Sequence, residues 1–182
     1  MDILLGIALI VIIYAIYSYN MLVELRERVR NSLAQIDVIL RKRVDLVTNL
    51  VNTVKGYVKH ERETLNQIIE LRTKFLNSQS LQDKIDTSNM ITQALKSVFA
   101  IAEAYPDLKA NQNFLMLKQE LSKLEQELAA TRMSYNDVVQ KYNTTIKIFP
   151  NNLFAIIFGF REESYLNLSL TEEERKVPKV EF

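Results

Sequence analysis

The chain of 182 residues contains no cysteine. Disulfides, thiolate metal sites and thiol catalysis are therefore excluded. Glycine and proline are also scarce, with three of each. The three glycines, Gly6, Gly56 and Gly159, lie too far apart to form a glycine-rich phosphate loop. No proline occurs before Pro106, so the first half of the chain contains no strong helix breaker.

Histidine is nearly absent as well, which limits the chemistry of any site. The single histidine, His60, stands in the string HERET, and Thr64 occupies the position where the HExxH zinc motif needs its second histidine. No Glu-x-x-His motif of a di-iron bundle and no nucleophile-elbow string is present. We therefore expect no catalytic, metal-binding or cofactor-binding residues and no bound cofactor, and we predict that the protein is not an enzyme.

The charges of the chain almost cancel. Lys plus Arg number 23 and Asp plus Glu number 22, which gives a formal net charge of +1. A dedicated nucleic-acid binder needs a basic face that displaces counterions from phosphates. The balance therefore argues against nucleic acid as a partner.

One long apolar run stands at the N-terminus. The run from Ile3 to Val23 has no charged residue, and as a helix it spans roughly 30 Å, the thickness of a bilayer core. A cleaved signal peptide would begin with basic residues, but only Met1 and Asp2 precede the run. Tyr14, Tyr17 and Tyr19 suit an aromatic belt at one membrane interface. The sequence predicts an uncleaved single-pass anchor in the cell membrane.

The basic residues beside this run predict its orientation. None precedes it, whereas Arg26, Arg28 and Arg30 follow it closely. Since positive residues are retained in the cytoplasm, we expect the N-terminus outside and the C-terminal domain in the cytoplasm. The alternative is a signal anchor that leaves the domain outside.

Helical periodicity dominates the chain after the anchor. From Val29 to Phe75 apolar residues recur every three to four positions, which predicts a first helix that continues from the anchor to about Asn77. Gly56 lies inside this pattern as a weak point that costs about 1 kcal/mol, not as a stop. We expect a second helix with its N-cap at Thr87 or Ser88.

Pro106 should end the second helix, because the residue before a proline avoids the α region. A third helix is predicted from Phe114 to near Phe149, with Leu121 and Leu124 in the middle of its apolar stripe. The apolar run from Leu153 to Phe158 is too short to span a bilayer. It is interpreted as a fourth helix that caps the bundle or, as the alternative, as an interfacial segment.

The predicted fold class is all-α: a single N-terminal transmembrane helix followed by an up-and-down, antiparallel long-helix bundle with four helices. The predicted domains are an anchor at residues 1–23, a helical bundle at residues 24–160 and an irregular acidic tail at residues 161–182.

A basic cluster at residues 41–43 lies in the first helix. Arg41 is expected to pair with Asp45 on a solvated helix face. Arg43 falls beside the apolar stripe, and we expect it to pair inside the bundle with a carboxylate such as Glu120 or Glu125.

Several strings, in order along the chain, carry a resemblance to a known family. They are RKRVDLVTNLVNTVKGYVKHERETL (41–65), EAYPDLKANQNFL (103–115), RMSYNDVVQKYNTTIKIFP (132–150), FGF (158–160) and PKVEF (178–182). Together they resemble the LemA family of bacterial membrane-anchored helical proteins. The resemblance covers nearly the whole chain and implies a helical bundle behind one anchor, with no catalytic residue or cofactor to carry over. Thr48 replaces a proline usual in that family, which favours an unbroken helix there.

The motif residues of this resemblance have structural explanations. Residues 105–109 would form a turn in which Tyr105 packs and Pro106 stops the helix. Tyr135, Asn136, Tyr142 and Asn143 place polar tips on an apolar stripe.

The leading functional hypothesis is a membrane-tethered, non-enzymatic scaffold or adaptor that binds other proteins. A membrane-associated signalling or sensing component is the alternative. An enzyme with an unrecognised inter-helix site is the third hypothesis, for which the polar residues Arg43, Lys109, Asn111, Arg132 and Asn143 are the candidates. The expected partners are the lipid bilayer through Ile3–Val23 and an unidentified protein, with a second copy of the chain as an open alternative.

Overall fold

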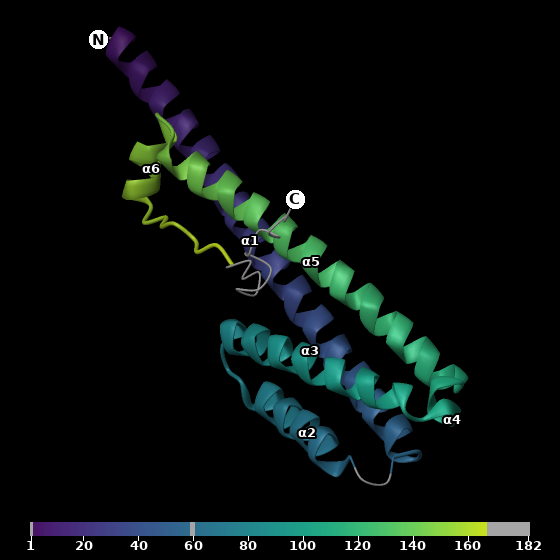
Figure 1. The fold of residues 1–182 in the computed structure, drawn as a ribbon. Coiled ribbons are helices and arrows are strands. Elements are labelled where there is room, and N and C mark those ends of the chain that lie inside the picture. Colours follow the sequence, from purple (N-terminus) through teal and green to yellow (C-terminus); the bar gives the residue numbers. More distant parts are fainter. Residues whose placement is uncertain (1, 59–60, 167–182) are drawn as a thin grey trace, which may run out of the picture. The chain divides into compact units, whose positions relative to one another are not determined.

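The computed structural model describes residues 2–58 and 61–166. These residues form six α-helices and no strand (Figure 1). The helices are α1 (Asp2–Lys55), α2 (Arg62–Asn77), α3 (Leu81–Glu103), α4 (Pro106–Lys109), α5 (Gln112–Lys147) and α6 (Asn151–Ile157). The all-α fold class is confirmed, with six helices where the sequence pattern predicted four.

The chain divides into two compact units, and each is described by itself. The terminal unit comprises Met1–Leu33 and Thr131–Phe182, and the middle unit comprises Ala34–Ala130. Because α1 and α5 are long, each contributes one part to the terminal unit and one part to the middle unit.

The core of the middle unit is built from the apolar stripes of its helices. α1 contributes Ile36, Leu40 and a series of valines, and α5 contributes buried leucines that include Leu121 and Leu124. Burial of the two leucines confirms the stripe predicted for this helix. α2 and α3 add buried side chains at helical spacing, Leu65, Ile68, Phe75, Ile85, Ile91, Leu95 and Val98.

The first helix ends earlier than the periodicity predicted. α1 stops at Lys55, and a turn at Gly56 and Tyr57 replaces the expected continuation to Asn77. In this turn the Gly56 N–H bonds the carbonyl of Thr53, and the low helix propensity of glycine favours a break there. Val58, beyond the turn, is still buried. The apolar pattern therefore continues across the break, and periodicity alone does not reveal it.

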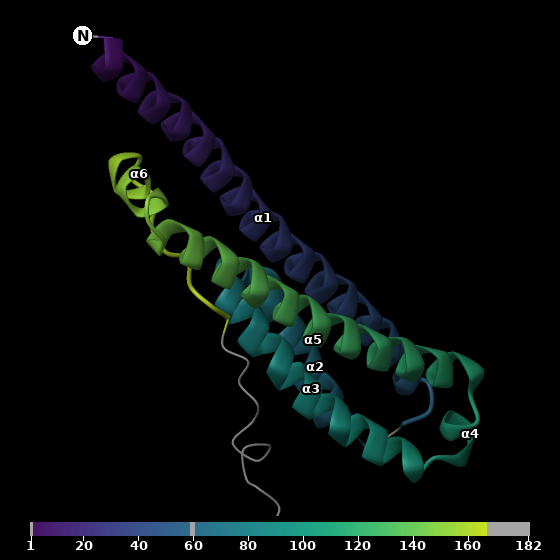
Figure 2. The ribbon, with the colours of Figure 1, turned by 90° about the horizontal axis from the view of Figure 1, so that it is seen from above.

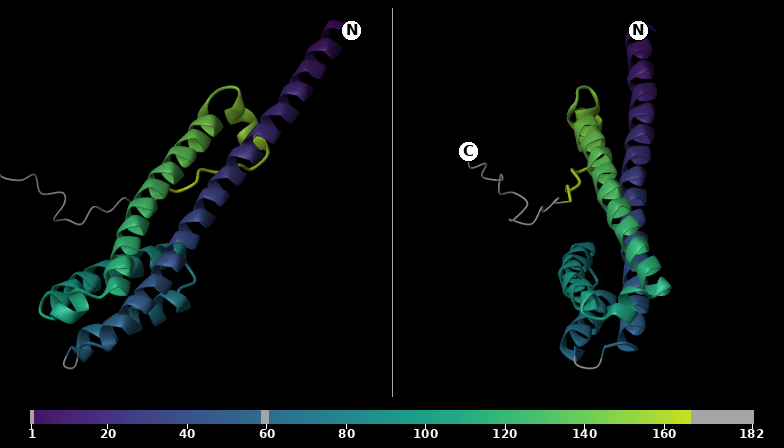
Figure 3. Two further views of the ribbon diagram at one scale, coloured as in Figure 1. Left: turned by 90° about the vertical axis from the view of Figure 1, so that its right-hand side faces the viewer. Right: turned by 45° about the vertical axis from the view of Figure 1, so that its right-hand side comes forward.

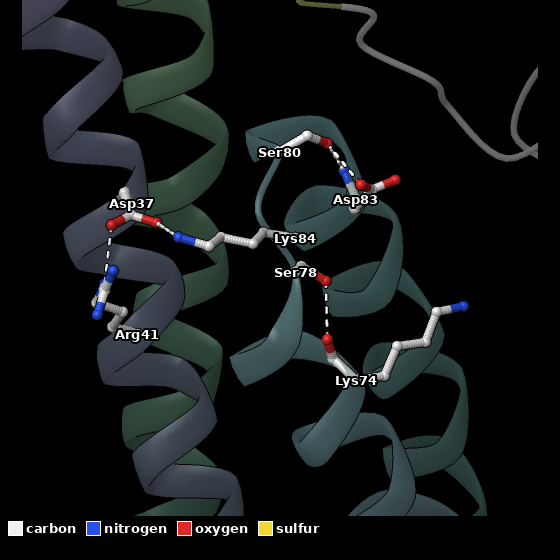
Figure 4. A network of polar contacts seen from close by, with 7 residues as sticks. All are labelled: Asp37, Arg41, Lys74, Ser78, Ser80, Asp83 and Lys84. Atoms are coloured by element: carbon white, nitrogen blue, oxygen red, sulfur yellow. Dashed lines mark hydrogen bonds and ion pairs between the residues drawn. The ribbon is translucent and has the colours of Figure 1, made fainter.

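The start of α3 also differs from the prediction. The N-cap is Ser80, whose hydroxyl accepts a hydrogen bond from the Asp83 N–H at 3.0 Å and donates to the Asp83 carboxylate at 2.7 Å (Figure 4). The first of these bonds is an N-cap, which satisfies one free backbone donor of the first turn. The expected caps, Thr87 and Ser88, are instead buried inside the helix. The short polar break at residues 78–80 thus suffices to reverse the chain between α2 and α3.

An ion-pair network joins α1 to the start of α3. Asp37 accepts hydrogen bonds from Lys84 at 2.7 Å and from Arg41 at 2.8 Å (Figure 4). Burial raises the pKa of Asp37, but these two cations outweigh burial and hold the pKa below its ordinary value of 3.8. The expected pairing of Arg41 with Asp45 is therefore wrong, because Asp37 lies between Arg41 and Lys84.

Proline ends α3 as predicted. α3 stops at Glu103, Tyr105 is extended, and Pro106 starts the four-residue helix α4. Figure 3 shows the chain turning from α3 through α4 into α5. α1 is unbroken through Thr48, whose hydroxyl bonds the carbonyl of Val44 at 2.9 Å.

The terminal unit pairs the first part of α1 with the last part of α5 and with α6. Every α1 side chain from Asp2 to Ile13 is exposed, although nearly all are apolar. A one-sided buried stripe begins only at Ser18 and continues through Leu22, Leu25 and Val29. The buried partners on the other segments are Tyr135, Val139, Tyr142, Ile146, Ala155 and Phe160.

The middle-unit core makes a first prediction. Leu121→Ala should destabilise the protein by about 2–5 kcal/mol, because truncation of a buried leucine leaves a cavity. The free energy of unfolding is measured by urea denaturation of the purified full chain in detergent, followed by circular dichroism. Leu115→Ala, on the same helix but exposed, is the matched control and should cost less than about 1 kcal/mol. Equal effects of the two variants would contradict the assigned core.

Candidate functional site

A ladder of polar side chains on α5 holds the extended segment 161–166 in the terminal unit. Tyr142 donates to the carbonyl of Arg161 at 2.9 Å, and Tyr135 donates to the carbonyl of Ser164 at 3.0 Å. The side-chain amide of Asn143 donates to the carbonyl of Glu163 and accepts its N–H, both at 2.9 Å.

Asn136 repeats this two-way bond one step further along the segment. Its amide donates to the carbonyl of Leu166 and accepts the N–H of Leu166, both at 3.0 Å. Each asparagine therefore satisfies both backbone groups of one residue, as a neighbouring β-strand would.

The distance between the two Tyr-Asn pairs along α5 matches the distance between the residues that they bind. The two Tyr-Asn pairs are seven residues apart on a helix, which corresponds to about 10.5 Å at 1.5 Å per residue. Their targets, Glu163 and Leu166, are three residues apart on an extended chain, which spans about 10 Å. Because the two repeats match, one heptad of α5 binds three residues of extended backbone.

The ladder tyrosines stay protonated donors. Both are buried, and burial raises the pKa of each hydroxyl above its ordinary value of 10.0, with a further rise from the Glu163 carboxylate. An ion pair of Lys147 with Glu162 at 2.7 Å adds a contact at the exposed edge.

The ladder binds backbone, so its chemistry is recognition and not catalysis. Every hydrogen bond from its four side chains goes to a main-chain group. Residues 161–166 are consequently an ordered part of the terminal unit, although the sequence pattern placed them in an irregular tail. Residues 167–182 of that predicted tail lie outside the described residues. The signal in the sequence was the Tyr-Asn pair repeated at a heptad interval.

A second polar site in the middle unit surrounds Arg43 of α1. Its guanidinium is only 3% exposed and forms an ion pair with Glu125 of α5 at 2.5 Å, which confirms the predicted partner. It also donates to the hydroxyls of Ser88 at 2.7 Å and Thr92 at 2.5 Å on α3. Since a guanidinium cannot lose its charge, these groups must compensate its burial. The site joins three helices in one register.

The other polar candidates have different partners. Lys109 pairs with Glu103. Asn111 donates to the Tyr57 hydroxyl at 2.8 Å and accepts the N–H of Phe114 at 3.0 Å near the start of α5. Arg132 is part-buried at the start of the α5 segment in the terminal unit. Lys109 and Asn111 therefore make separate contacts.

Two further observations bear on chemistry. Among residues 2–58 and 61–166, no three acidic or histidine side chains gather as metal ligands, and His60 lies outside the described residues. A surface cleft of the middle unit is formed by other residues than the polar candidates, namely Lys55, Val58, Arg62, Leu65 and Asn66.

Comparison with known proteins gives one family by two routes, a family model and a curated relative. The sequence model of the LemA family matches residues 32–182. Protein LemA of Metamycoplasma hominis is 31% identical, and the match covers 79% of this chain and 67% of that protein. The magnetosome proteins MamQ 1 and MamQ 2 of Paramagnetospirillum magneticum are each 21% identical, over 81% of this chain. The match spans 64% of the length of each MamQ protein.

The ladder makes a second prediction. Asn143→Ala removes both bonds to Glu163, a loss of about 1 kcal/mol or roughly fivefold in the local opening equilibrium. Hydrogen exchange of the full chain should therefore show faster exchange at the Glu163 amide. Asn136→Ala is the matched variant and should act mainly on the Leu166 amide. Unchanged exchange at both amides would show that the ladder does not hold the segment.

Proposed function

The chain belongs to the LemA family, and we propose that it acts as a membrane-tethered, non-enzymatic helical scaffold or adaptor that binds other proteins. The observation that carries the proposal is the change of exposure along α1. Side chains from Ile3 to Ile13 are exposed on all faces and apolar, whereas a one-sided stripe is buried from Ser18 onward. A helix that is apolar all round needs an apolar surrounding.

The membrane is the surrounding that fits this part of α1. α1 is long and apolar enough near its N-terminus to cross a bilayer, and only 6% of its apolar 18-residue stretch is buried within the protein. In a core helix of a soluble protein, most of such a stretch would be buried. The same helix then continues without a break to Lys55.

The proposed orientation places the folded part in the cytoplasm. Arg26, Arg28 and Arg30 follow the candidate span within a few residues, as cytoplasmic flanks do. Arg28 and Arg30 are largely exposed and pair with Glu24 and Glu27 on the α1 surface. Acidic neighbours weigh little in this orientation rule, so the basic residues determine it.

The non-enzymatic part of the proposal is supported by the structural contacts that the polar residues make. Arg43 compensates its burial with helix partners, and Asn136 and Asn143 bind the backbone of the chain itself. Such contacts build a rigid helical frame. We therefore propose that the exposed surfaces of this frame bind a protein partner.

A third prediction tests attachment and topology. The full chain with a C-terminal tag should remain in the membrane fraction after an alkaline carbonate wash, because Ile3–Val23 is embedded in lipid. Protease added to intact cells should leave the tag uncut. Recovery of the full chain in the soluble fraction would contradict the anchor, and cleavage of the tag would reverse the orientation.

The matched variant for this test is Arg28→Glu with Arg30→Glu. Both side chains are exposed, so the fold should tolerate the change. The fraction of tag cut from outside should increase, because fewer positive charges retain the domain in the cytoplasm. Arg26 is left unchanged because its guanidinium lies over the Phe160 ring at 5.1 Å.

A fourth prediction concerns the adaptor role. The tagged full chain, cross-linked in native membranes and then purified, should recover a specific protein in comparable amount. An unrelated tagged single-span protein is the control bait. Recovery of cross-linked copies of the chain alone would indicate a homo-oligomer instead, and recovery of no cross-linked protein would contradict the adaptor role.

A further inference from the structure

The segment that includes α6 is uncharged and exposes large apolar side chains. Residues 148–160 contain no charged residue, whereas Lys147 and Arg161 flank them on either side. Ile156 is 77% exposed, Ile157 is 70% exposed and Phe149 is 74% exposed. Exposure of such side chains to water is unfavourable relative to burial. A patch of this kind marks a surface that binds something apolar.

Contacts within the terminal unit fix the position of this segment along α1. Asn151, at the start of α6, accepts hydrogen bonds from Tyr14 at 3.0 Å and from Ser18 at 3.1 Å. The Phe154 ring lies 5.6 Å from the Tyr14 ring. Both α1 residues belong to the uncharged run Ile3–Val23. α6, which follows the end of α5 in Figure 2, therefore lies beside the candidate span and not beyond it.

The aromatic contacts locate residues 148–160 along the C-terminal half of the span. The Phe158 ring packs edge-on against Tyr19 at 5.0 Å, and Phe160 lies 6.0 Å from Tyr19. Tyrosine side chains with an apolar body and a polar tip concentrate at the headgroup level of bilayers. Arg26, whose guanidinium lies over Phe160, is the first cation after the span.

Several polar groups at the segment bond within the protein, which suits a medium of low polarity. Ser18 is fully buried, and its hydroxyl donates to the side-chain oxygen of Asn151. At the end of α6, the Phe158 N–H bonds the Phe154 carbonyl, and the Phe160 N–H bonds the Ala155 carbonyl. Gly159 takes the left-handed φ of 71° that this closing turn requires.

We propose that residues 148–160 insert their exposed apolar side chains into the lipid leaflet, at the boundary of headgroups and acyl chains. The inference rests on the proposed membrane anchoring, and it adds a second membrane contact beside the span. The occupant of the α6 face is lipid because the neighbouring segment of α1 is itself exposed, apolar and uncharged. A helix too short to span the bilayer lies in its interface instead.

The second contact has a mechanical consequence. A single span leaves the attached protein free to rotate about the membrane normal and to tilt. Insertion of α6 fixes the rotation of α1, because Asn151 and Phe154 bind one face of that helix. The α5 segment of the terminal unit, with its ladder, is thereby held in one orientation to the membrane surface.

The absence of tryptophan from the chain allows a direct test. Three single-tryptophan variants of the full chain are reconstituted into vesicles of phosphatidylcholine and phosphatidylglycerol. Ile157→Trp reports on α6, Ile10→Trp reports on the middle of the candidate span, and Met133→Trp reports on an exposed position of α5. Part of the phosphatidylcholine is replaced by analogues brominated near the headgroup or near the chain end, and acrylamide is the aqueous quencher.

The proposal expects Ile157→Trp to show blue-shifted emission and loss of fluorescence mainly with the shallow bromines. Ile10→Trp lies three residues, about 4.5 Å at 1.5 Å per residue, from the midpoint of the run Ile3–Val23 and should be quenched more by the deep bromines. Met133→Trp should be quenched by acrylamide and not by brominated lipid. Phe149→Trp, an aromatic replacement in the same segment, is a second reporter if Ile157→Trp loses helical circular dichroism.

Each result that would contradict the proposal has its own quenching pattern. Lipid quenching of Ile10→Trp with only acrylamide quenching of Ile157→Trp would overturn the interfacial insertion and leave the anchor intact. Protection of Ile157→Trp from both quenchers would also overturn it, because protein, such as a second copy, would then cover α6. No lipid quenching of Ile10→Trp would overturn the membrane anchoring itself.

Discussion

The rest of the structure depends on α1 being one uninterrupted helix. Its residues are helical from Asp2 to Lys55, so the segment that is apolar on all faces and the segment with one buried stripe belong to the same helix. Both compact units are built on this helix, the terminal unit on residues up to Leu33 and the middle unit from Ala34 onward. The boundary between the units, at Leu33 and Ala34, therefore lies within this helix.

Polar side chains fix the geometry that apolar packing alone leaves open. Leucine and valine stripes allow neighbouring helices to slide by a turn at little cost, whereas a buried guanidinium tolerates only one arrangement of its partners. In the middle unit Arg43 requires Ser88, Thr92 and Glu125 together. In the terminal unit Asn136 and Asn143 require the backbone of segment 161–166 at a set register. The need to fix the register explains why polar residues occur on helix stripes that are otherwise apolar.

The proposed lipid contact of α6 and the ladder of α5 belong to one continuous stretch of chain. α5 carries the ladder, leads into the uncharged segment 148–160, and the chain then returns as the extended segment that the ladder binds. The charges at Lys147 and Arg161 mark where this stretch enters and leaves the apolar region. Recognition of backbone by the ladder thus closes the loop that presents α6.

The sequence by itself determined the helical class, the apolar segment Ile3–Val23 and the stripe with Leu121 and Leu124, because periodicity and charge are local properties. It predicted a carboxylate partner for Arg43, and the tertiary structure selected Glu125 over Glu120. Only the tertiary structure decided where α1 ends, since Val58 continues the apolar pattern past the turn at Gly56. It also decided that Ser80 caps α3 and that Asp37 binds Arg41 and Lys84. The same holds for the role of the repeated Tyr-Asn pairs, whose partner backbone lies about 20–30 residues further along the chain. A sequence pattern predicts which face of a helix is buried. The residues that contact this face depend on how distant segments of the chain pack.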